Sequence, residues 1–415
     1  AAAAAAGGGD GGVTAPVVRR RVDELLDGVE AEGETYDVLR VCGLDAIPAL
    51  LVFSTSRLFL LPGWAKAPAD MDGAPTAEPA EVGAAEAEAD MPIRAAVLQE
   101  VDASHGWAHV HGDVAYASWG LSELCEPVRR RYQLQPWALQ IAFRSGGSLF
   151  ISAQSGEVRA ALHSRLQSTL SPHPGSEERE RRSSSEEVRS WSSGGVGESP
   201  SILTEAWQEG RSSSLDYLMG LNHLAGRSYD DLMQWPVFPW VVREHSSGEL
   251  SLTAEASYRD LGRPMGAQTE GRAAQFKRRL DEWVDDDEQE AAADGLRKFH
   301  YGTHYSTAAS VSSYLLRLQP FTDYHLALQG GRFDLADRLF HCVSEEWQLA
   351  SGERGNDTGC VKELIPELFY MPEALLNVNR LDLGRRQHGD PLDHVILPTW
   401  ARGSAWRYVR MMRQV

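Results

Sequence analysis

Short apolar runs separated by turn residues mark the chain up to about residue 170. Residues 49–53 (ALLVF) and 58–61 (LFLL) form one pair of runs, and residues 138–143 (ALQIAF) and 149–151 (LFI) form another. Apolar runs of this length, bounded by Ser, Gly and Arg, are typical of β-strands joined by tight turns. The pattern therefore predicts two β-hairpins in this region.

A helix is expected directly after the second hairpin. Ser155 is a suitable N-cap residue, because its hydroxyl can accept a hydrogen bond from a free backbone N–H group of the first turn. Behind it, apolar residues recur with the period of a helix, at Val158, Ala161, Leu162 and Leu166. Several strands followed by one closing helix predict an α+β domain.

After residue 200 the apolar spacing becomes helical. A first helical piece is followed by three apolar stripes, one behind Thr269 as N-cap, one stopped by Pro320, and one behind Asp334 as N-cap. The first piece contains Leu215, Leu218 and Met219, and the stripes contain Phe276, Leu280, Trp283 and Val284; Val311, Tyr314, Leu315 and Leu318; and Ala336, Leu339, Phe340, Val343 and Trp347. The second half of the chain is therefore expected to be mainly helical.

One segment of this half, residues 235–240 (WPVFPW), fits neither a helix nor a central strand. Pro236 and Pro239 lack a backbone N–H group, and each proline pushes the residue before it into extended geometry. The segment is expected to be rigid and extended. Its aromatic side chains, Trp235, Phe238 and Trp240, are expected to be buried, because exposed they would form a large apolar patch.

Three stretches of biased composition divide the chain. Residues 1–30 are expected to be disordered, and residues 171–200, rich in Ser, Glu and Arg, are interpreted as a disordered linker. An acidic stretch at 65–92 contains almost no bulky apolar residue, which favours an inserted loop. These boundaries leave one domain at 31–170 and a second at 201–415.

The formal net charge of -19 argues against a nucleic-acid partner, which requires a basic surface. No apolar run reaches the length of a membrane span. The cysteines are expected to be reduced thiols in a cytoplasmic protein; they are Cys42, Cys125, Cys342 and Cys360. The chain has no initiator Met and ends inside a helical pattern, which suggests a piece of a longer polypeptide.

Candidate catalytic and metal-binding residues are few. His300 and His304 have the i,i+4 spacing of a helical metal site, but Gly302 and the absence of a suitably placed Glu argue against one. His341 is a third candidate, far away in the sequence. Asp334 and Asp337 are interpreted as helix-start carboxylates, which a helix dipole stabilises, rather than an acid–base pair. No catalytic residue, metal site or cofactor is predicted, and the chain is not expected to be an enzyme.

The triplet Arg129, Arg130 and Arg131 is the one run of adjacent cations in the β region. Two interpretations stay open: it contacts an inositol phosphate headgroup, or it is a solvated or interdomain charge run. The second is preferred because the whole chain is acidic.

Several motifs in the second half resemble those of the BEACH domain, in the family's order. They are LDYLMGLN (215–222), AGRSYDDLMQWPVFPW (225–240), YRDLGRPMGAQ (258–268), FHYGTHYS (299–306), QGGRFDLADRLF (329–340), VKELIPELFY (361–370) and LPTW (397–400). Upstream, residues 118–139 resemble the PH-like domain that precedes BEACH domains. Arg211 to Ser214 depart from the family pattern, which often has an Asn-Phe pair there.

The resemblance implies a PH-like β-barrel with a C-terminal helix, docked on a mainly α BEACH domain whose core is irregular and extended. It makes Trp235, Pro236, Phe238, Pro239, Trp240, Arg332 and Asp334 structural motif residues. It also implies that the last BEACH helices lie beyond Val415 and that a WD-repeat domain follows.

The expected function is a non-enzymatic scaffold in vesicle, lysosome and autophagy traffic, in the cytoplasm and peripheral to endomembranes. It would bind other proteins through the PH–BEACH cleft and reach intracellular membranes indirectly. The alternative is a phosphoinositide-binding module that targets membranes.

Overall fold

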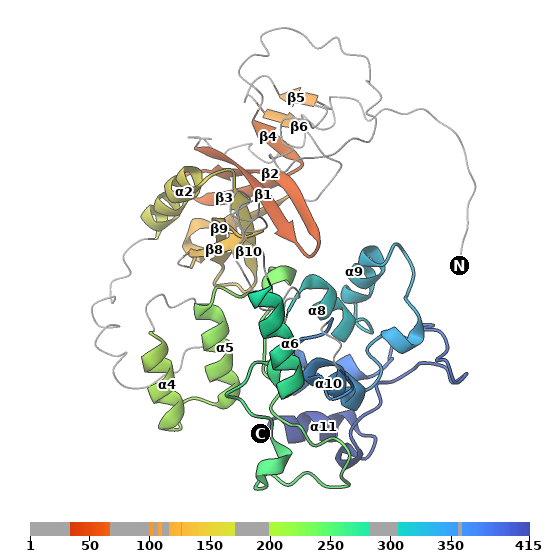
Figure 1. The fold of residues 1–415 in the computed structure, drawn as a ribbon. Helices are drawn as coiled ribbons and strands as arrows, with labels where there is room; N and C mark the ends of the chain where they lie inside the picture. Colours follow the sequence, from red (N-terminus) through yellow and green to blue (C-terminus); the bar gives the residue numbers. More distant parts are fainter. Residues whose placement is uncertain are drawn as a thin grey trace, which may run out of the picture. The chain divides into compact units, whose positions relative to one another are not determined.

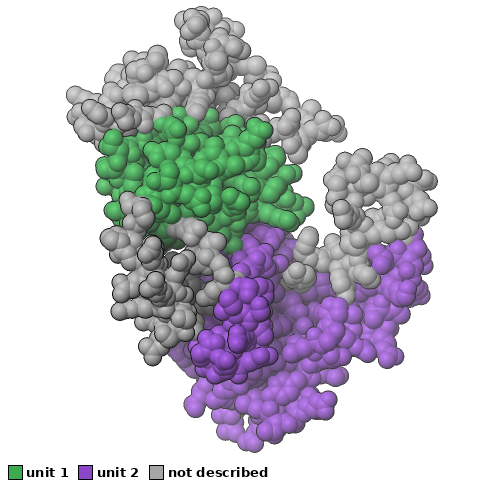
Figure 2. All heavy atoms as spheres, turned by 90° about the vertical axis from the view of Figure 1, so that its left-hand side faces the viewer, with its two compact units in different colours: residues 1–198 green, residues 199–415 purple. Residues whose placement is uncertain are grey.

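The computed structural model describes residues 34–66, 100–102, 107–109, 116–125, 127–170, 199–282, 306–355 and 359–415. The chain divides into two compact units, unit 1 (residues 1–198) and unit 2 (residues 199–415) (Figure 2). Unit 1 is built on β-sheet and unit 2 on helices, so the class is α+β (Figure 1). None of the described helices has the length and apolar composition needed to cross a membrane.

Unit 1 contains a seven-stranded antiparallel sheet in the order β7-β3-β2-β1-β10-β9-β8. Its strands are β1 (Thr35–Cys42), β2 (Asp45–Phe53), β3 (Arg57–Pro62), β7 (Ala117–Gly120), β8 (Val128–Tyr132), β9 (Gln135–Ala142) and β10 (Ser148–Ala153). Among the described strands, β7 pairs only with β3 and β8 only with β9, so strand pairing leaves the sheet open. Closure into a barrel therefore stays a prediction.

Both predicted hairpins are confirmed, as β2–β3 and β9–β10. In the first, the Ser54 hydroxyl accepts hydrogen bonds from the backbone N–H groups of Ser56 (3.3 Å) and Arg57 (2.9 Å). This is the local pairing that makes serine favourable in turns.

Helix α2 (Gly156–Thr169) follows β10, and its N-cap is Ser155, whose hydroxyl accepts from the Val158 N–H group at 3.2 Å. Leu162 and Leu166 of α2 are buried in the same apolar cluster as alternate residues of the sheet, whereas Ala161, expected in the stripe, is exposed.

A small second sheet belongs to unit 1. It consists of β4 (Trp64–Lys66), β6 (Trp107–His109) and β5 (Glu100–Asp102), paired in that order. Residues 65 and 66, expected at the start of an inserted loop, lie in β4; the rest of the predicted loop, 67–92, lies outside the described residues.

Unit 2 consists of short helices joined by long stretches without regular structure (Figure 1). The α-helices among its described residues are α4 (Pro200–Gln208), α5 (Ser214–Leu224), α6 (Glu270–Asp281), α8 (Ala308–Tyr314), α9 (Phe321–Leu328), α10 (Val343–Ser351) and α11 (Ala405–Met412). The short 3₁₀ helices are η3 (Leu232–Gln234), η4 (Glu255–Ser257), η5 (Met265–Ala267), η6 (Ala336–Arg338), η7 (Pro366–Phe369), η8 (Pro372–Leu375) and η9 (Thr399–Ala401).

Two of the predicted helices differ from the structure. In the apolar stripe at 311–318, helix α8 ends at Tyr314, before the last residues of the stripe. Pro320 does not end this helix but is the N-cap of α9. The helix expected behind Asp334 is divided into η6, an extended stretch and α10, whose N-cap is Cys342. The reason is a contact with a distant part of the chain, because the backbone of this stretch pairs with that of Ile396. The Ile396 N–H group donates to His341 O (2.7 Å), and the Val343 N–H group donates to Ile396 O (3.0 Å).

Candidate functional site

The aromatic–proline segment, residues 235–240, is extended and lies in the core of unit 2. Trp235, Phe238 and Trp240 are 6%, 1% and 1% exposed. Phe238 exchanges two backbone hydrogen bonds of 2.9 Å with Leu364, in a second extended segment. The backbone of the preceding residue, Val237, is paired with the Asn222 side chain. Asn222 Oδ1 accepts from Val237 N (2.8 Å), and Asn222 Nδ2 donates to Val237 O (2.9 Å).

The indole groups tie the same two segments together. Trp240 Nε1 donates to Lys362 O at 3.0 Å, and Trp235 Nε1 donates to the Glu367 carboxylate at 3.2 and 3.4 Å. The Phe238 ring packs edge-on against Phe369, with 5.1 Å between centroids. Burying these donors without a partner would be costly, and each has one.

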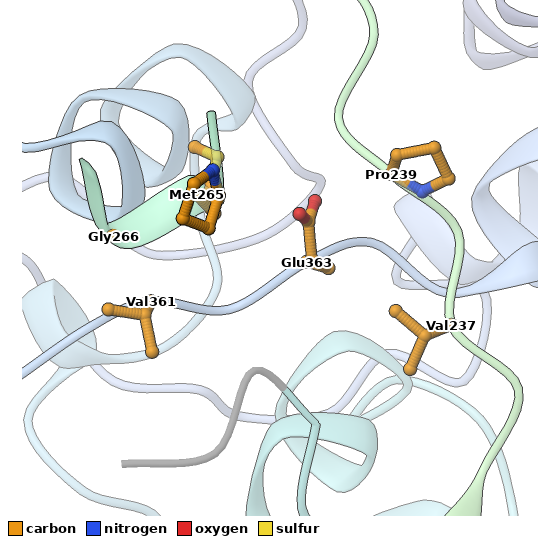
Figure 3. A pocket seen from close by; sticks show the side chains of 7 residues that line it. Val237, Pro239, Met265, Gly266, Val361 and Glu363 are labelled. Atoms are coloured by element: carbon orange, nitrogen blue, oxygen red, sulfur yellow. The ribbon is translucent and has the colours of Figure 1, made fainter. Parts of the chain in front are cut away.

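A pocket of about 290 Å³ opens between the two extended segments and η5. Five of its lining side chains are apolar and one is a carboxylate; the lining residues are Val237, Pro239, Pro264, Met265, Gly266, Val361 and Glu363. In Figure 3 the Glu363 carboxylate stands between Met265 and Pro239. The pocket is therefore an apolar recess with one polar group.

The Glu363 carboxylate is held by fixed donors. Arg259 Nη1 lies 2.9 Å from both carboxylate oxygens, and the Trp240 backbone N–H donates to Oε2 at 2.8 Å. Burial raises the pKa of Glu363, whereas Arg259 and the Trp240 N–H group act to lower it. A buried carboxylate whose charge is balanced by a bonded arginine is suited to binding a ligand rather than to acting as a general base.

A second buried carboxylate, Glu367, interacts electrostatically with Tyr229 and Tyr370. Its residue is 4% exposed, and burial raises its pKa to about 7. The hydroxyl groups of Tyr229 and Tyr370 lie 3.3 Å apart, and burial followed by the charge of Glu367 raises the pKa of Tyr370 to about 12. Trp235 Nε1 donates to the Glu367 carboxylate at 3.2 Å, and Trp235 and Tyr370 both act to lower the pKa of Glu367.

Two buried arginines, Arg272 and Arg317, were not identified by the sequence patterns. Both are 0% exposed and donate to backbone carbonyls. Arg272 binds Leu349 O (3.0 Å), Ala350 O (2.8 Å) and Cys360 O, and so satisfies the carboxyl end of α10. Arg317 binds Asp393 O (3.0 Å) and Phe340 O (2.9 Å), and burial lowers its pKa to about 10.

The glycine that follows α10 is required by Arg272. Gly352 has φ +82, and a Cβ atom there would lie 2.5 Å from Arg272 Cδ. We expect Gly352→Ala to cost about 2–4 kcal/mol of unfolding free energy, from left-handed strain plus overpacking. Gly210 has φ +72 with nothing within 4 Å, so Gly210→Ala is the matched control and should cost about 1 kcal/mol. Equal losses in urea denaturation would contradict the clash.

The arginine triplet does not form one surface. Arg129 and Arg131 are exposed, but Arg130 is 4% exposed and its Nε donates to Gln140 Oε1 at 2.9 Å. Alternation along β8 puts neighbours on opposite faces of the sheet. Burial therefore contradicts the solvated interpretation for Arg130, which lies in the middle of β8, and the interdomain interpretation stays a prediction. Exposed cations on an edge strand also discourage pairing with other chains.

The other predicted residues are dispersed. Arg332 is exposed, after a Gly330–Gly331 turn. Asp334 is not the predicted helix cap; its Oδ1 accepts from Leu335 N at 2.7 Å and lies 3.5 Å from Arg338 Nη1.

His300 and His304 lie outside the described residues. His341 Nδ1 lies 2.8 Å from Leu339 O, and its Nε2 lies 3.5 Å from Glu345 Oε1. Within the described ranges, no three His, Cys, Asp or Glu side chains are placed to share a metal ion. The four cysteines are free.

The Beige/BEACH domain family profile matches residues 205–415. The chain therefore belongs to the BEACH family, with its BEACH region in unit 2.

Curated relatives agree with this assignment. The chain is 40% identical over 306 residues to BEACH domain-containing protein A2 of Arabidopsis thaliana, covering 71% of this chain and 8% of that protein. It is 39% identical over 303 residues to WD repeat- and FYVE domain-containing protein 4 of Mus musculus, covering 71% and 9%. It is 46% identical over 214 residues to Beige protein homolog 1 of Schizosaccharomyces pombe, covering 51% and 8%. The chain thus spans less than a tenth of the length of these relatives.

Proposed function

We propose that this chain is a non-enzymatic module for protein–protein interaction in membrane trafficking, of the vesicle, lysosome and autophagy type. BEACH-domain proteins are implicated in membrane trafficking, and residues 205–415 match that family. The observation that carries the proposal is the pocket chemistry: an apolar recess whose carboxylate is already engaged by Arg259 and the Trp240 N–H group. Such a site favours binding over proton transfer.

The wider setting belongs to the same proposal. The module acts in the cytoplasm, peripheral to endomembranes, and reaches membranes through its protein partners. A WD-repeat domain is proposed to follow in the full-length protein, since one relative is named for WD repeats.

Blocking the pocket tests the proposal. Val237 is half-buried at the pocket, so Val237→Lys should place a charged side chain in it and remove specific proteins from those captured by the chain from a cell lysate. Val378 is 54% exposed and lies outside the pocket lining, so Val378→Lys is the matched control and should capture the wild-type set. Identical capture by all three forms would reject the pocket as the interaction site.

Direct lipid binding is expected to be weak. A net charge of -19 opposes attraction to anionic membranes, and the buried Arg130 cannot reach a headgroup. Liposome sedimentation with and without phosphoinositides should show no headgroup-selective binding, and Arg129→Glu with Arg131→Glu should change little. Micromolar selective binding that this double variant abolishes would instead establish the phosphoinositide-binding alternative.

A further inference from the structure

The walls of the pocket select an apolar ligand. Two valines, two prolines and a methionine line it, and the proline rings and branched valines have little freedom to rearrange. At about 290 Å³ the pocket is at the small end of ligand sites. This size suits one large side chain rather than a nucleotide or an acyl chain.

The charges at the pocket select a neutral ligand. Glu363 and Arg259 compensate each other at 2.9 Å, so the site carries no net charge. A lysine or arginine would be repelled by Arg259 and would compete for a carboxylate that is already bonded. An aspartate or glutamate would be repelled by Glu363. These considerations leave apolar and neutral polar side chains.

The carboxylate retains one acceptor position for a ligand. A carboxylate offers about four lone-pair sites. Arg259 Nη1 uses one on each oxygen, and the Trp240 N–H group uses the second on Oε2. The second site of Oε1 is left, on a side chain that is 13% exposed and stands between Met265 and Pro239 (Figure 3).

The described residues of unit 2 already contain two hydrogen bonds in which an indole N–H group donates to a carboxylate. Trp235 Nε1 donates to the Glu367 carboxylate, and Trp347 Nε1 donates to Glu353 Oε2 at 3.0 Å. An aromatic ring with an N–H or O–H group fills an apolar recess and also satisfies a buried acceptor, which is why Trp and Tyr serve as anchors at interfaces.

We infer that the pocket binds a tryptophan or tyrosine side chain of a partner protein, with its N–H or O–H group donating to Glu363 Oε1. This inference rests on the proposed function and specifies its partner: a protein segment with a donor-bearing aromatic anchor.

A pair of tripeptides tests the donor. Acetyl-Gly-Trp-Gly-amide should bind the chain in a ligand-observed NMR titration. The same peptide with 1-methyltryptophan, which lacks the indole N–H group, should bind at least about fivefold more weakly, the equivalent of about 1 kcal/mol for one hydrogen bond. Acetyl-Gly-Lys-Gly-amide should not bind. Equal affinity for the two tryptophan peptides, or no binding of either at millimolar concentration, would overturn the inference.

Variants locate the binding. Val237→Lys and Pro264→Lys should each abolish the tryptophan signal, and Pro264 is exposed at the pocket, so its replacement should leave the fold intact. Val378→Lys should bind as wild type. Binding that survives both blocking variants would place the peptide elsewhere and reject the site. Because the peptides need no cellular partner, their failure alongside successful, pocket-dependent protein capture would reject the aromatic anchor and leave the proposed function standing.

Discussion

Phe238→Ala is expected to lower the free energy of unfolding of unit 2 by about 3–5 kcal/mol, the usual cost of a large cavity in a packed core. The Phe238 ring is 1% exposed and packs against Phe369, and its backbone pairs with Leu364, so its surroundings cannot easily collapse into the space. Urea denaturation followed by tryptophan fluorescence measures the loss.

The matched control is Phe333→Ala, because Phe333 is half-buried and lies outside the two paired segments. It should cost clearly less than Phe238→Ala. A loss below about 1 kcal/mol for Phe238→Ala would mean that the aromatic–proline segment does not hold the core of unit 2.

Glu367→Gln is expected to change how stability depends on pH. Burial raises the folded-state pKa of Glu367 from 4.5 to about 7, so the folded state binds its proton more tightly than the unfolded state does. The contribution of Glu367 to the free energy of unfolding is fully present below about pH 4.5, where the carboxyl is protonated in both states. It is lost as the pH rises to about 7. A shift of this size corresponds to about 3 kcal/mol. The free energy of unfolding of the glutamine variant, relative to that of wild type, should therefore increase by about 3 kcal/mol between pH 4.5 and pH 8.

The difference between variant and wild type is the quantity to measure, by thermal or urea unfolding at several pH values. His245, whose pKa burial lowers to about 4, titrates identically in both proteins and cancels. Glu373→Gln removes an exposed carboxylate of η8 and is the control, with a flat difference expected. A flat difference for Glu367→Gln as well would show that the carboxylate is solvated.

Local chemistry was sufficient to predict the hairpins and several helix starts. Ser54, Ser155 and Thr269 form the turn and the caps that their side chains favour, because those interactions involve residues two or three apart. The continuous helix predicted to follow Asp334 was wrong. The Phe340 carbonyl accepts a hydrogen bond from Arg317, and the His341 carbonyl accepts one from Ile396; no local pattern encodes these contacts. The apolar spacing there reflects burial in the core without a continuous helix.

The candidate site depended on tertiary structure even more strongly. The proline pattern indicated an extended, buried segment at 235–240, since two missing N–H groups exclude a helix interior and a central strand. The pocket could not be predicted, because its walls come from residues 237–239, 264–266 and 361–363, which converge only in the folded unit. Arg272 and Arg317 were missed for the same reason, since their partners are backbone carbonyls elsewhere in the chain.

The pairing of residues 235–240 with the segment around Leu364 has a consequence for how this chain is made. Trp235 and Glu367 are separated by 132 residues, and Glu244 and Trp400, which are joined by an indole hydrogen bond, by 156 residues. At roughly 5–20 residues per second, a ribosome needs several seconds or more to cover that separation. During this interval the apolar segment with its three large aromatic rings lacks the segment with which it pairs. Unit 2 therefore depends on late, long-range closure, and its nascent chain should be a strong substrate for chaperones that bind exposed apolar segments.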